Sequence, residues 1–188
     1  MRIISGIAKG KKIYTPINKK TRPLKDMVRE SIFNIILHSN LLNAKFENCI
    51  VLDLFSGIGS FGLEAISRGV KKVIFFEDYG PSVELLIKNV NTLKFNKNAN
   101  IIRKNIYKFN NFSDLKCKFN LVFLDPPFED KNIVLILKNL ADPKILNSES
   151  LIIIHRHKRT IDKFDKNFKI LREEVYGSSK IIFGFFSF

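Results

Sequence analysis

Apolar residues follow two alternating patterns along the chain from about residue 49 onward. Short continuous runs rich in Val, Ile, Leu and Phe predict buried strands at 49–55, 71–78, 98–105, 119–125 and 150–155. Stretches with apolar residues at helical spacing separate them and predict helices at 59–69, 81–95 and 131–140. This alternation indicates an α/β domain, with a parallel sheet covered on its faces by helices.

The C-terminal part breaks this alternation. Residues 168–176 and 180–188 read as two strands on either side of the turn Gly177-Ser178-Ser179, and they predict an antiparallel hairpin. A sheet that ends in such a hairpin is unlike a dinucleotide-binding fold built from two equal halves.

The N-terminal part is distinct in its charge. Residues 1–16 predict a short basic hairpin, and residues 24–37 predict a helix with an apolar stripe. Residues 1–44 carry nine Lys and Arg against two acids, so half of the net charge of +14 lies there. We therefore expect a basic extension over 1–44, packed on a main domain over 45–188.

Composition narrows the class of protein. The chain has 188 residues, of which 45% are hydrophobic and 27% charged, which fits a single globular unit. No secretory leader or membrane-spanning run is evident, and Cys49 and Cys117 lack the spacing of a metal site, so we expect a reduced, cytoplasmic protein without a metal. The strong positive charge predicts a nucleic-acid partner, although abundant lysine can also reflect a nucleotide bias of the coding sequence.

The loop after the first strand contains Gly57, Gly59 and Gly62 in the GxGxxG pattern, which is common in dinucleotide-binding proteins. Asp53, at the end of the preceding strand, would repel a pyrophosphate but would suit the ammonium or sulfonium group of S-adenosylmethionine. A helix-capping role is the alternative for Asp53. Glu77 ends the second strand and can accept hydrogen bonds from the ribose hydroxyls of either cofactor. We expect Gly62 to ease packing of the helix on the sheet.

The tetrapeptide Asp125-Pro126-Pro127-Phe128 follows the fourth strand. The carboxylate of Asp125 and the carbonyl of Pro126 can each accept one hydrogen of an exocyclic base amine, which would direct the nitrogen lone pair at a methyl group. The ring of Phe128 can stack on the base. This element predicts methylation of a nucleobase amine, with neither a metal nor a nucleophilic side chain required.

Several stretches together resemble one bacterial family, the 16S rRNA guanine-N2 methyltransferases. The stretches are VLDLFSGIGSFGLEAISRG, FFED, LVFLDPPF and the N-terminal RIISGIAKGKKIYTP…TRPLKDMVRESIFNII. The N-terminal block is the specific part, because the other motifs define only the methyltransferase superfamily.

The resemblance implies a Rossmann-like, seven-stranded class I methyltransferase sheet with S-adenosyl-L-methionine as the methyl donor. It also implies methylation of the N2 amine of one guanine in 16S rRNA of the 30S subunit or an assembly intermediate, with guanine 966 as the expected position. A monomer is the expected state.

The resemblance, together with the motifs and charge described above, implies three groups of site residues. The catalytic group is Asp125, Pro126, Pro127 and Phe128. The cofactor-binding group is Asp53, Phe55, Gly57, Gly59, Glu77, Asp78, Asn105 and Ile106. The RNA-binding group is Arg2, Lys9, Lys11, Lys12, Arg22, Arg29 and Arg156.

This chain departs from the family pattern at several of these positions. Tyr79 stands where a second acid is common, so ribose binding depends on Glu77 unless Asp78 takes part. Asn105 stands where an acid is expected beside the adenine, although its carbonyl can still meet the adenine amine. The basic run 155–159 is either a solvated loop or a phosphate contact, and we expect none of the three histidines to be catalytic.

Two other functions fit the sequence less well. The first is a base-amine methyltransferase with another substrate, such as adenine N6 in DNA or RNA, since the tetrapeptide suits either amine. The second is a non-catalytic RNA-binding assembly factor on a methyltransferase scaffold.

Overall fold

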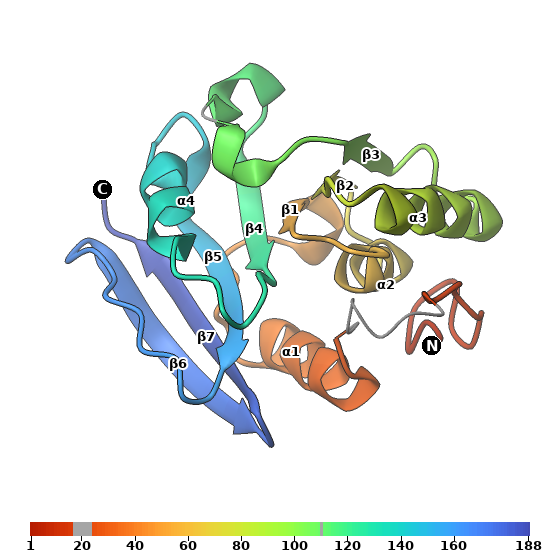
Figure 1. Ribbon diagram of the computed structural model, residues 1–188, viewed down its shortest axis with the longest axis horizontal. Coiled ribbons are helices and arrows are strands. Elements are labelled where there is room, and N and C mark those ends of the chain that lie inside the picture. Colours follow the sequence, from red (N-terminus) through yellow and green to blue (C-terminus); the bar gives the residue numbers. More distant parts are fainter. Residues whose placement is uncertain (17–23, 110) are drawn as a thin grey trace.

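The computed structural model describes residues 1–16, 24–109 and 111–188. Within these residues the strands form one seven-stranded sheet in the order β3-β2-β1-β4-β5-β7-β6 (Figure 1). The strands are β1 (Ile50–Leu54), β2 (Lys72–Phe76), β3 (Ala99–Ile102), β4 (Phe119–Leu124), β5 (Leu146–His157), β6 (Phe168–Tyr176) and β7 (Ser179–Phe186). The first five are parallel, and β7 runs antiparallel to both β5 and β6. The predicted α/β sheet with a terminal hairpin is confirmed.

The helices lie close to their predicted positions. The α-helices are α1 (Asp26–His38), α2 (Ser60–Ser67), α3 (Gly80–Leu93) and α4 (Ile133–Leu140), with short 3-10 helices at Phe46–Asn48, Ile106–Lys108 and Phe112–Leu115. No helix in the described part of the chain combines the length and hydrophobicity that crossing a bilayer requires.

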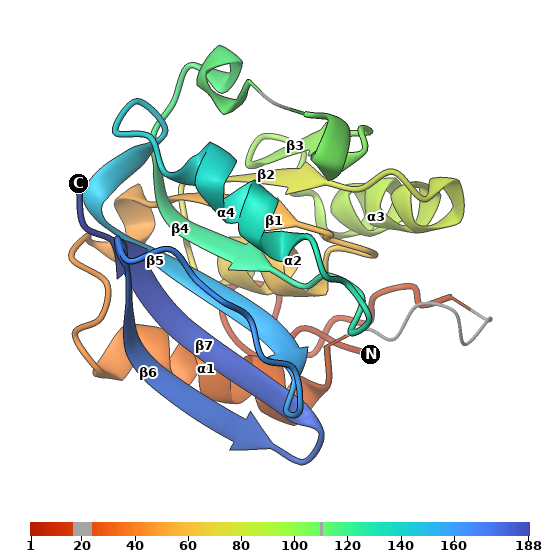
Figure 2. The same ribbon diagram turned by 60° about the vertical axis from the view of Figure 1, so that its left-hand side comes forward.

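The core has two layers because successive strand residues point to opposite faces of the sheet. Val51 of β1 and Phe123 of β4 pack on one face with α1, α2 and α3, whereas Leu52 and Val122 pack on the other face with α4. Figure 2 shows α4 on one side of the sheet and the other three helices on the opposite side. Strands buried on both faces explain the continuous apolar runs in the sequence.

The N-terminal segment shares this core instead of forming one of its own. Ile3 and Ile13 are buried in the same cluster as α1, α2 and β1. The predicted hairpin is limited to a single antiparallel bridge between Arg2 and Lys12, so it is a folded loop without a strand ladder. The buried carboxylate of Glu64 holds this loop by accepting hydrogen bonds from the backbone N–H groups of Ile4 and Ser5.

A buried amide joins the N-terminal segment to the glycine-rich loop. The side chain of Asn89 in α3 accepts a hydrogen bond from the Tyr14 N–H at 2.7 Å and donates to the carbonyls of Tyr14 and Ile58 at 3.1 and 3.2 Å. Segments far apart in sequence are therefore tied together beside the loop that follows β1.

Candidate cofactor and active site

The strand register brings the predicted site residues to one edge of the sheet. Leu54, the last residue of β1, lies beside Phe76 of β2 and beside Leu124 of β4, and Leu124 lies beside Ile154 of β5. The residues that follow these positions therefore meet at the carboxyl edge, where open α/β sheets bind their ligands. Four of the residues that follow are Phe55, Glu77, Asp125 and His155.

The glycine-rich loop turns back through left-handed backbone conformations. Gly57 has φ +55° and Gly59 has φ +81°. A Cβ atom on Gly57 would meet nothing within 4 Å, whereas one on Gly59 would lie 2.3 Å from the Leu86 side chain. Gly57 thus leaves open space on the surface of the loop, and Gly59 lets the loop pack against α3.

Gly62 has a different role from the other two glycines. A Cβ atom there would lie 2.3 Å from the ring of Phe75 and 2.8 Å from Val73, both in β2. Gly62 therefore permits close approach of α2 to the sheet, which confirms the expected packing role.

Asp53 lies beneath the loop. It is only 1% exposed, and its carboxylate accepts a hydrogen bond from the Gly62 N–H at 3.0 Å, within the first turn of α2. Burial raises the pKa of Asp53 well above its ordinary value, the hydrogen bond from Gly62 opposes this, and nearby Asp125 and Glu77 add to the rise. The capping alternative is therefore realised, and a cation above Asp53 would relieve its unfavourable burial. Binding of a cofactor ammonium by Asp53 stays a prediction.

Glu77 organises the loop before any ligand binds. Its carboxylate accepts hydrogen bonds from the N–H groups of Gly57 at 2.7 Å, Tyr79 at 2.9 Å and Asp78 at 3.1 Å. Burial raises its pKa, although the hydrogen bonds from Tyr79 and Gly57 counteract that effect. Three of about four acceptor positions on a carboxylate are thus occupied, which leaves about one for a ribose hydroxyl.

The side-chain amide of Asn105 joins the segment after β3 to the segment after β2. Asn105 donates a hydrogen bond to the Asp78 carboxylate at 2.6 Å, and its own carbonyl accepts from the Tyr107 N–H at 3.0 Å. Asp78 is thereby held by Asn105, and Ile106 is buried beside them. The centroid of the Phe55 ring lies 5.7 Å from that of the Tyr107 ring, so the residue after β1 contacts the segment after β3.

Asp125 sits directly across from the glycine-rich loop. Its N–H donates to the carbonyl of Leu54 in β1 at 3.3 Å, and its side chain is 23% exposed. Pro126 is buried, and within the described residues no hydrogen bond uses its carbonyl. Phe128 is 37% exposed, so its ring is accessible at the edge of the site. The predicted acceptor groups, the Asp125 carboxylate and the Pro126 carbonyl, therefore follow β4 next to the end of β1, where the predicted cofactor loop begins.

His155, which we did not expect to take part, contacts this element directly. Its Nδ1 lies 2.7 Å from the Asp125 carboxylate, and its Nε2 lies 2.8 Å from the Ser179 hydroxyl. The Phe128 ring lies edge-on to both His155 and His157, with centroid distances of 5.2 and 5.4 Å. The available signal was sequence position, because Asp125 follows Leu124 of β4 and His155 follows Ile154 of β5, and these two strand residues pair in register.

Arg156 is not an RNA-binding residue as predicted, because its side chain is fully buried. Its guanidinium pairs with Asp162 at 2.9 Å and donates to the carbonyls of Asp130 at 2.6 Å and Pro127 at 3.4 Å. The hydroxyl of Tyr107 also donates to the Asp130 carboxylate. Arg156 thus braces the segment that carries Phe128, and a phosphate cannot reach it.

The prediction that Arg29 contacts RNA is wrong for the same reason. It is fully buried, donates to the carbonyl of Arg2 at 2.6 Å and lies 3.7 Å from Glu64. Burial lowers its pKa, whereas Glu64 and Asp26 raise it. Its charge therefore fastens the N-terminal loop to α1 and α2.

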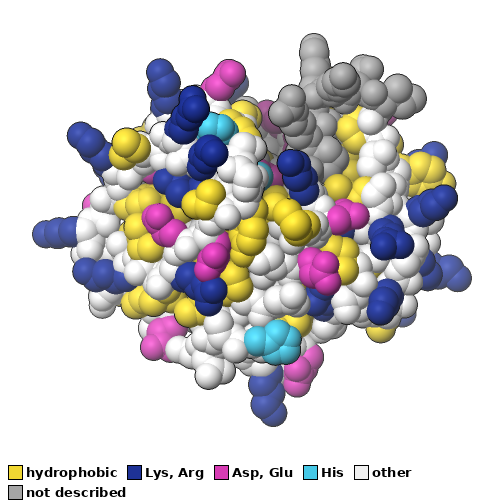
Figure 3. Space-filling model, turned by 90° about the horizontal axis from the view of Figure 1, so that it is seen from below, with side chains coloured by type: hydrophobic (Ala, Val, Ile, Leu, Met, Phe, Trp, Pro, Cys, Tyr) yellow, Lys and Arg dark blue, Asp and Glu magenta, His cyan; other side chains and the backbone are white. Residues whose placement is uncertain are grey.

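The other predicted RNA contacts differ in what the structure says of them. Arg2, Lys9, Lys11 and Lys12 are exposed on the N-terminal loop and stay predictions, whereas Arg22 lies outside the described residues. Figure 3 looks at the molecule from below Figure 1, toward the end at which β4 and β5 point. Lys and Arg side chains project around much of the edge of this face as far as it is described, and others lie further in, among hydrophobic and acidic side chains.

The residues around the loop fit S-adenosylmethionine and not a dinucleotide. A pyrophosphate-binding loop must offer free backbone N–H groups, but the Gly57 N–H is already donated to Glu77. Two buried or half-buried carboxylates, Asp53 and Glu77, would also repel phosphates. The open space at Gly57 can accept the methionine part of the cofactor. Within the described residues there is no cluster of three or more His, Cys, Asp or Glu side chains that could hold a metal ion.

Comparison with known proteins identifies one family and several methyltransferases that are similar to this chain. The model of the family described as "Conserved hypothetical protein 95" matches residues 1–185. "Putative rRNA methyltransferase YlbH" of Bacillus subtilis is 30% identical over 180 residues, covering 94% of each chain. "Ribosomal RNA small subunit methyltransferase D" of Escherichia coli is 33% identical over 178 residues, covering 94% of this chain and 85% of that relative. A solved structure, "Putative methyltransferase yhhF from Escherichia coli", superposes with a TM-score of 0.78 at 30% identity, covering 100% of this chain and 98% of the other.

Proposed function

We propose that this protein, which belongs to the family of conserved hypothetical protein 95 and resembles the small-subunit rRNA methyltransferases D, methylates the N2 amine of a guanine in 16S rRNA. S-adenosyl-L-methionine is the methyl donor. The proposed position is guanine 966, and the proposed substrate is the 30S subunit or an assembly intermediate.

A single observation carries the choice of an amine as acceptor. Asp125 and Pro126 follow β4, which pairs in register with β1, so two hydrogen-bond acceptors lie at the same sheet edge as the glycine-rich loop. An exocyclic amine has two hydrogens, and the Asp125 carboxylate and the Pro126 carbonyl can take one each. A hydroxyl or a ring carbon has no such pair of hydrogens to offer.

The bound cofactor supplies an electrophilic sulfonium methyl group. Asp125 and Pro126 orient the amine so that its lone pair points at that group, and alignment of this kind accounts for much of the rate enhancement in group transfer. The Phe128 ring supports the base by stacking, which contributes about 1–3 kcal/mol per base.

The basic N-terminal loop supports an RNA substrate. Lys9, Lys11 and Lys12 are exposed on it and can contact phosphates without reading sequence. A guanine that is stacked or paired must be turned out of its stack to reach Asp125, at a cost of a few kcal/mol. Phosphate contacts on either side of the base can offset this cost.

Labelled S-adenosylmethionine would be incubated with the protein and unmethylated 30S particles, naked 16S rRNA or DNA, and the modified nucleoside mapped. We expect N2-methylguanosine at a single position in 16S rRNA. N6-methyladenine as the only product would overturn the proposal in favour of the adenine alternative. Tight RNA binding without any product would instead indicate a non-catalytic assembly factor.

A further inference from the structure

His155 differs from the other histidines in the way that it is tied to the site. Its ring bridges the carboxylate of Asp125, just after β4, and the Ser179 hydroxyl of β7, and it is almost fully buried. It also touches the Phe128 ring edge-on. We infer that His155 is a positioning residue, which fixes Asp125 and Phe128 in the orientation that receives the base amine; this inference rests on the proposed function.

The hydrogen bonds determine which nitrogen carries the proton. An ionised carboxylate only accepts, so the Nδ1 of His155 donates to Asp125. Ser179 engages the opposite nitrogen at 2.8 Å and holds the plane of the ring in that arrangement. A histidine held at both nitrogens cannot rotate without losing a bond inside the protein.

The bond from His155 leaves one carboxylate oxygen for the substrate. His155 occupies Oδ1 of Asp125, and within the described residues no hydrogen bond uses Oδ2. The terminal torsion of an aspartate is broad and nearly two-fold, so an unheld carboxylate would sample many orientations. His155 restricts that freedom by holding Oδ1.

Serine, histidine and aspartate in this order also occur in hydrolases. Here the Ser179 residue is only 7% exposed, whereas the side chain of Asp125 is 23% exposed. The end that meets solvent and substrate is the carboxylate, so the chain of hydrogen bonds supports Asp125 and does not activate a serine nucleophile.

Two amide variants separate the two contacts of the ring. An asparagine side chain can place its N–H near the position of Nδ1, whereas a glutamine side chain reaches the position of Nε2. His155→Asn should therefore keep the bond to Asp125, and His155→Gln should keep only the contact with Ser179.

We expect kcat to fall about 10²-fold in His155→Gln, as for a catalytic group displaced by about 1 Å, and to stay within a few-fold of wild type in His155→Asn. The KM for S-adenosylmethionine should equal the wild-type value in both variants. The two variants should also have similar midpoints of thermal unfolding. Wild-type kcat in His155→Gln, or equal losses in both variants, would overturn the inference. The comparison can be made on whichever amine the wild-type protein methylates, so it stands apart from a failure of the proposed substrate.

A spectroscopic measurement does not depend on turnover. In the ¹⁵N spectrum of the imidazoles, His155 should carry its proton on Nδ1, and Asp125→Ala should change that signal while leaving His38 unaffected. A proton found on Nε2 alone would contradict the inference even if no substrate were active.

Discussion

The N–H of Gly57 donates a hydrogen bond to the Glu77 carboxylate at 2.7 Å, joining the loop after β1 to the end of β2. Gly57 is held at a φ of +55° by this bond, so the loop is organised by a side chain of the protein itself. In a phosphate-binding loop the ligand would take that N–H. The relationship between these two residues therefore separates this glycine-rich loop from dinucleotide sites of similar sequence.

The glycines of the loop should separate into a ligand-binding and a packing class. Gly57→Ala should weaken S-adenosylmethionine binding by about tenfold or more, with a stability loss near the 1–2 kcal/mol cost of a left-handed alanine. Gly62→Ala, the matched variant, should cost about 1–3 kcal/mol by crowding Phe75 and Val73, with a smaller effect on cofactor affinity. Calorimetric titration and urea unfolding measure the two effects. The reverse pattern would show that the roles are exchanged.

Asp53→Asn should stabilise the free protein at neutral pH. Burial raises the pKa of Asp53 in the folded state above its ordinary value of 3.8, so folding loses stability as pH rises from that value through the raised pKa. Asparagine cannot ionise but can still accept from the Gly62 N–H. The advantage of the variant in the free energy of unfolding should therefore be absent near pH 4 and grow as the pH rises through the raised pKa of Asp53.

The same variant should bind S-adenosylmethionine less tightly, because the negative charge beneath the cofactor ammonium is lost. Unchanged affinity together with increased stability would leave Asp53 with a capping role alone.

Asp125→Ala should lower kcat by at least about 10²-fold and leave cofactor affinity nearly unchanged. The carboxylate contacts His155 and faces the proposed base, and Gly57 and Glu77, which organise the loop, do not depend on it. Single-turnover methylation and calorimetric titration measure the two quantities. Collapse of cofactor affinity would show that our division of roles is wrong.

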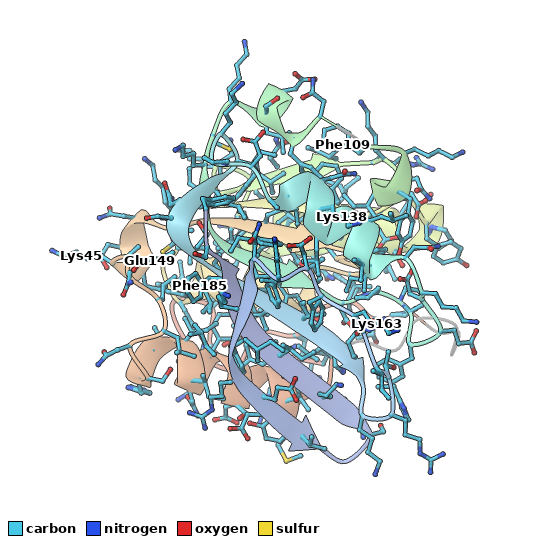
Figure 4. The ribbon with its side chains drawn as sticks, turned by 90° about the vertical axis from the view of Figure 1, so that its left-hand side faces the viewer. Lys45, Phe109, Lys138, Glu149, Lys163 and Phe185 are labelled. Carbon is cyan, nitrogen blue, oxygen red and sulfur yellow. The ribbon has the colours of Figure 1, made fainter. Side chains whose placement is uncertain are left out.

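Neutralising Lys9, Lys11 and Lys12 should weaken RNA binding and flatten its dependence on salt. The slope of log K against log salt should fall by about 0.7–0.9 for each phosphate that is no longer neutralised by a lysine. The matched control replaces Lys45, Lys71 and Lys118, which are exposed just before or near the starts of β1, β2 and β4. Figure 4 shows Lys45 at the end of the sheet away from Lys163 of the β5–β6 connection. Equal slopes for both triple variants would indicate that the lysines act only through net charge.

Arg156→Met should destabilise the protein without changing the salt slope of RNA binding. Removing the guanidinium leaves Asp162 and the carbonyl of Asp130 without their buried donor, which costs about 3–5 kcal/mol for a broken buried pair. Chemical unfolding gives the loss of stability, and binding titrations over a range of salt give the slope. If the salt slope of RNA binding fell by the amount expected for one phosphate, Arg156 would be an RNA contact after all.

Much of the fold was predictable because its strands are apolar and its helices have regular spacing. The length of β5 was not, since the predicted strand 150–155 is shorter than Leu146–His157 at both ends. Its first residue pairs with β4 and its last two with β7, which are interactions between residues far apart in the chain. The packing role of Gly62 was predictable from its place in a helix.

The candidate site was predictable where a motif follows a strand, as at Asp125 and Glu77. Arg29 and Arg156 were misassigned because their charge is evident from residue type, whereas their burial arises from carboxylates and carbonyls on other elements. His155 was missed because its role depends on Asp125 and Ser179, which are distant in the chain. The residues next to His155 in the sequence do not indicate these partners.

The hydrogen bonds from Asp125 through His155 to Ser179 also have a temporal consequence. They cross β4, β5 and β7, and β7 follows Asp125 by 54 residues (179 − 125). At a synthesis rate of about 5–20 residues per second, Ser179 leaves the ribosome roughly 3–10 s after Asp125. During that interval the glycine-rich loop and Asp125 already exist, but His155 is not yet synthesised at first, and afterwards it has no Ser179 to contact. A nascent chain therefore has the residues for the cofactor well before the hydrogen bonds behind Asp125 are complete, and it completes them only when β7 joins the sheet.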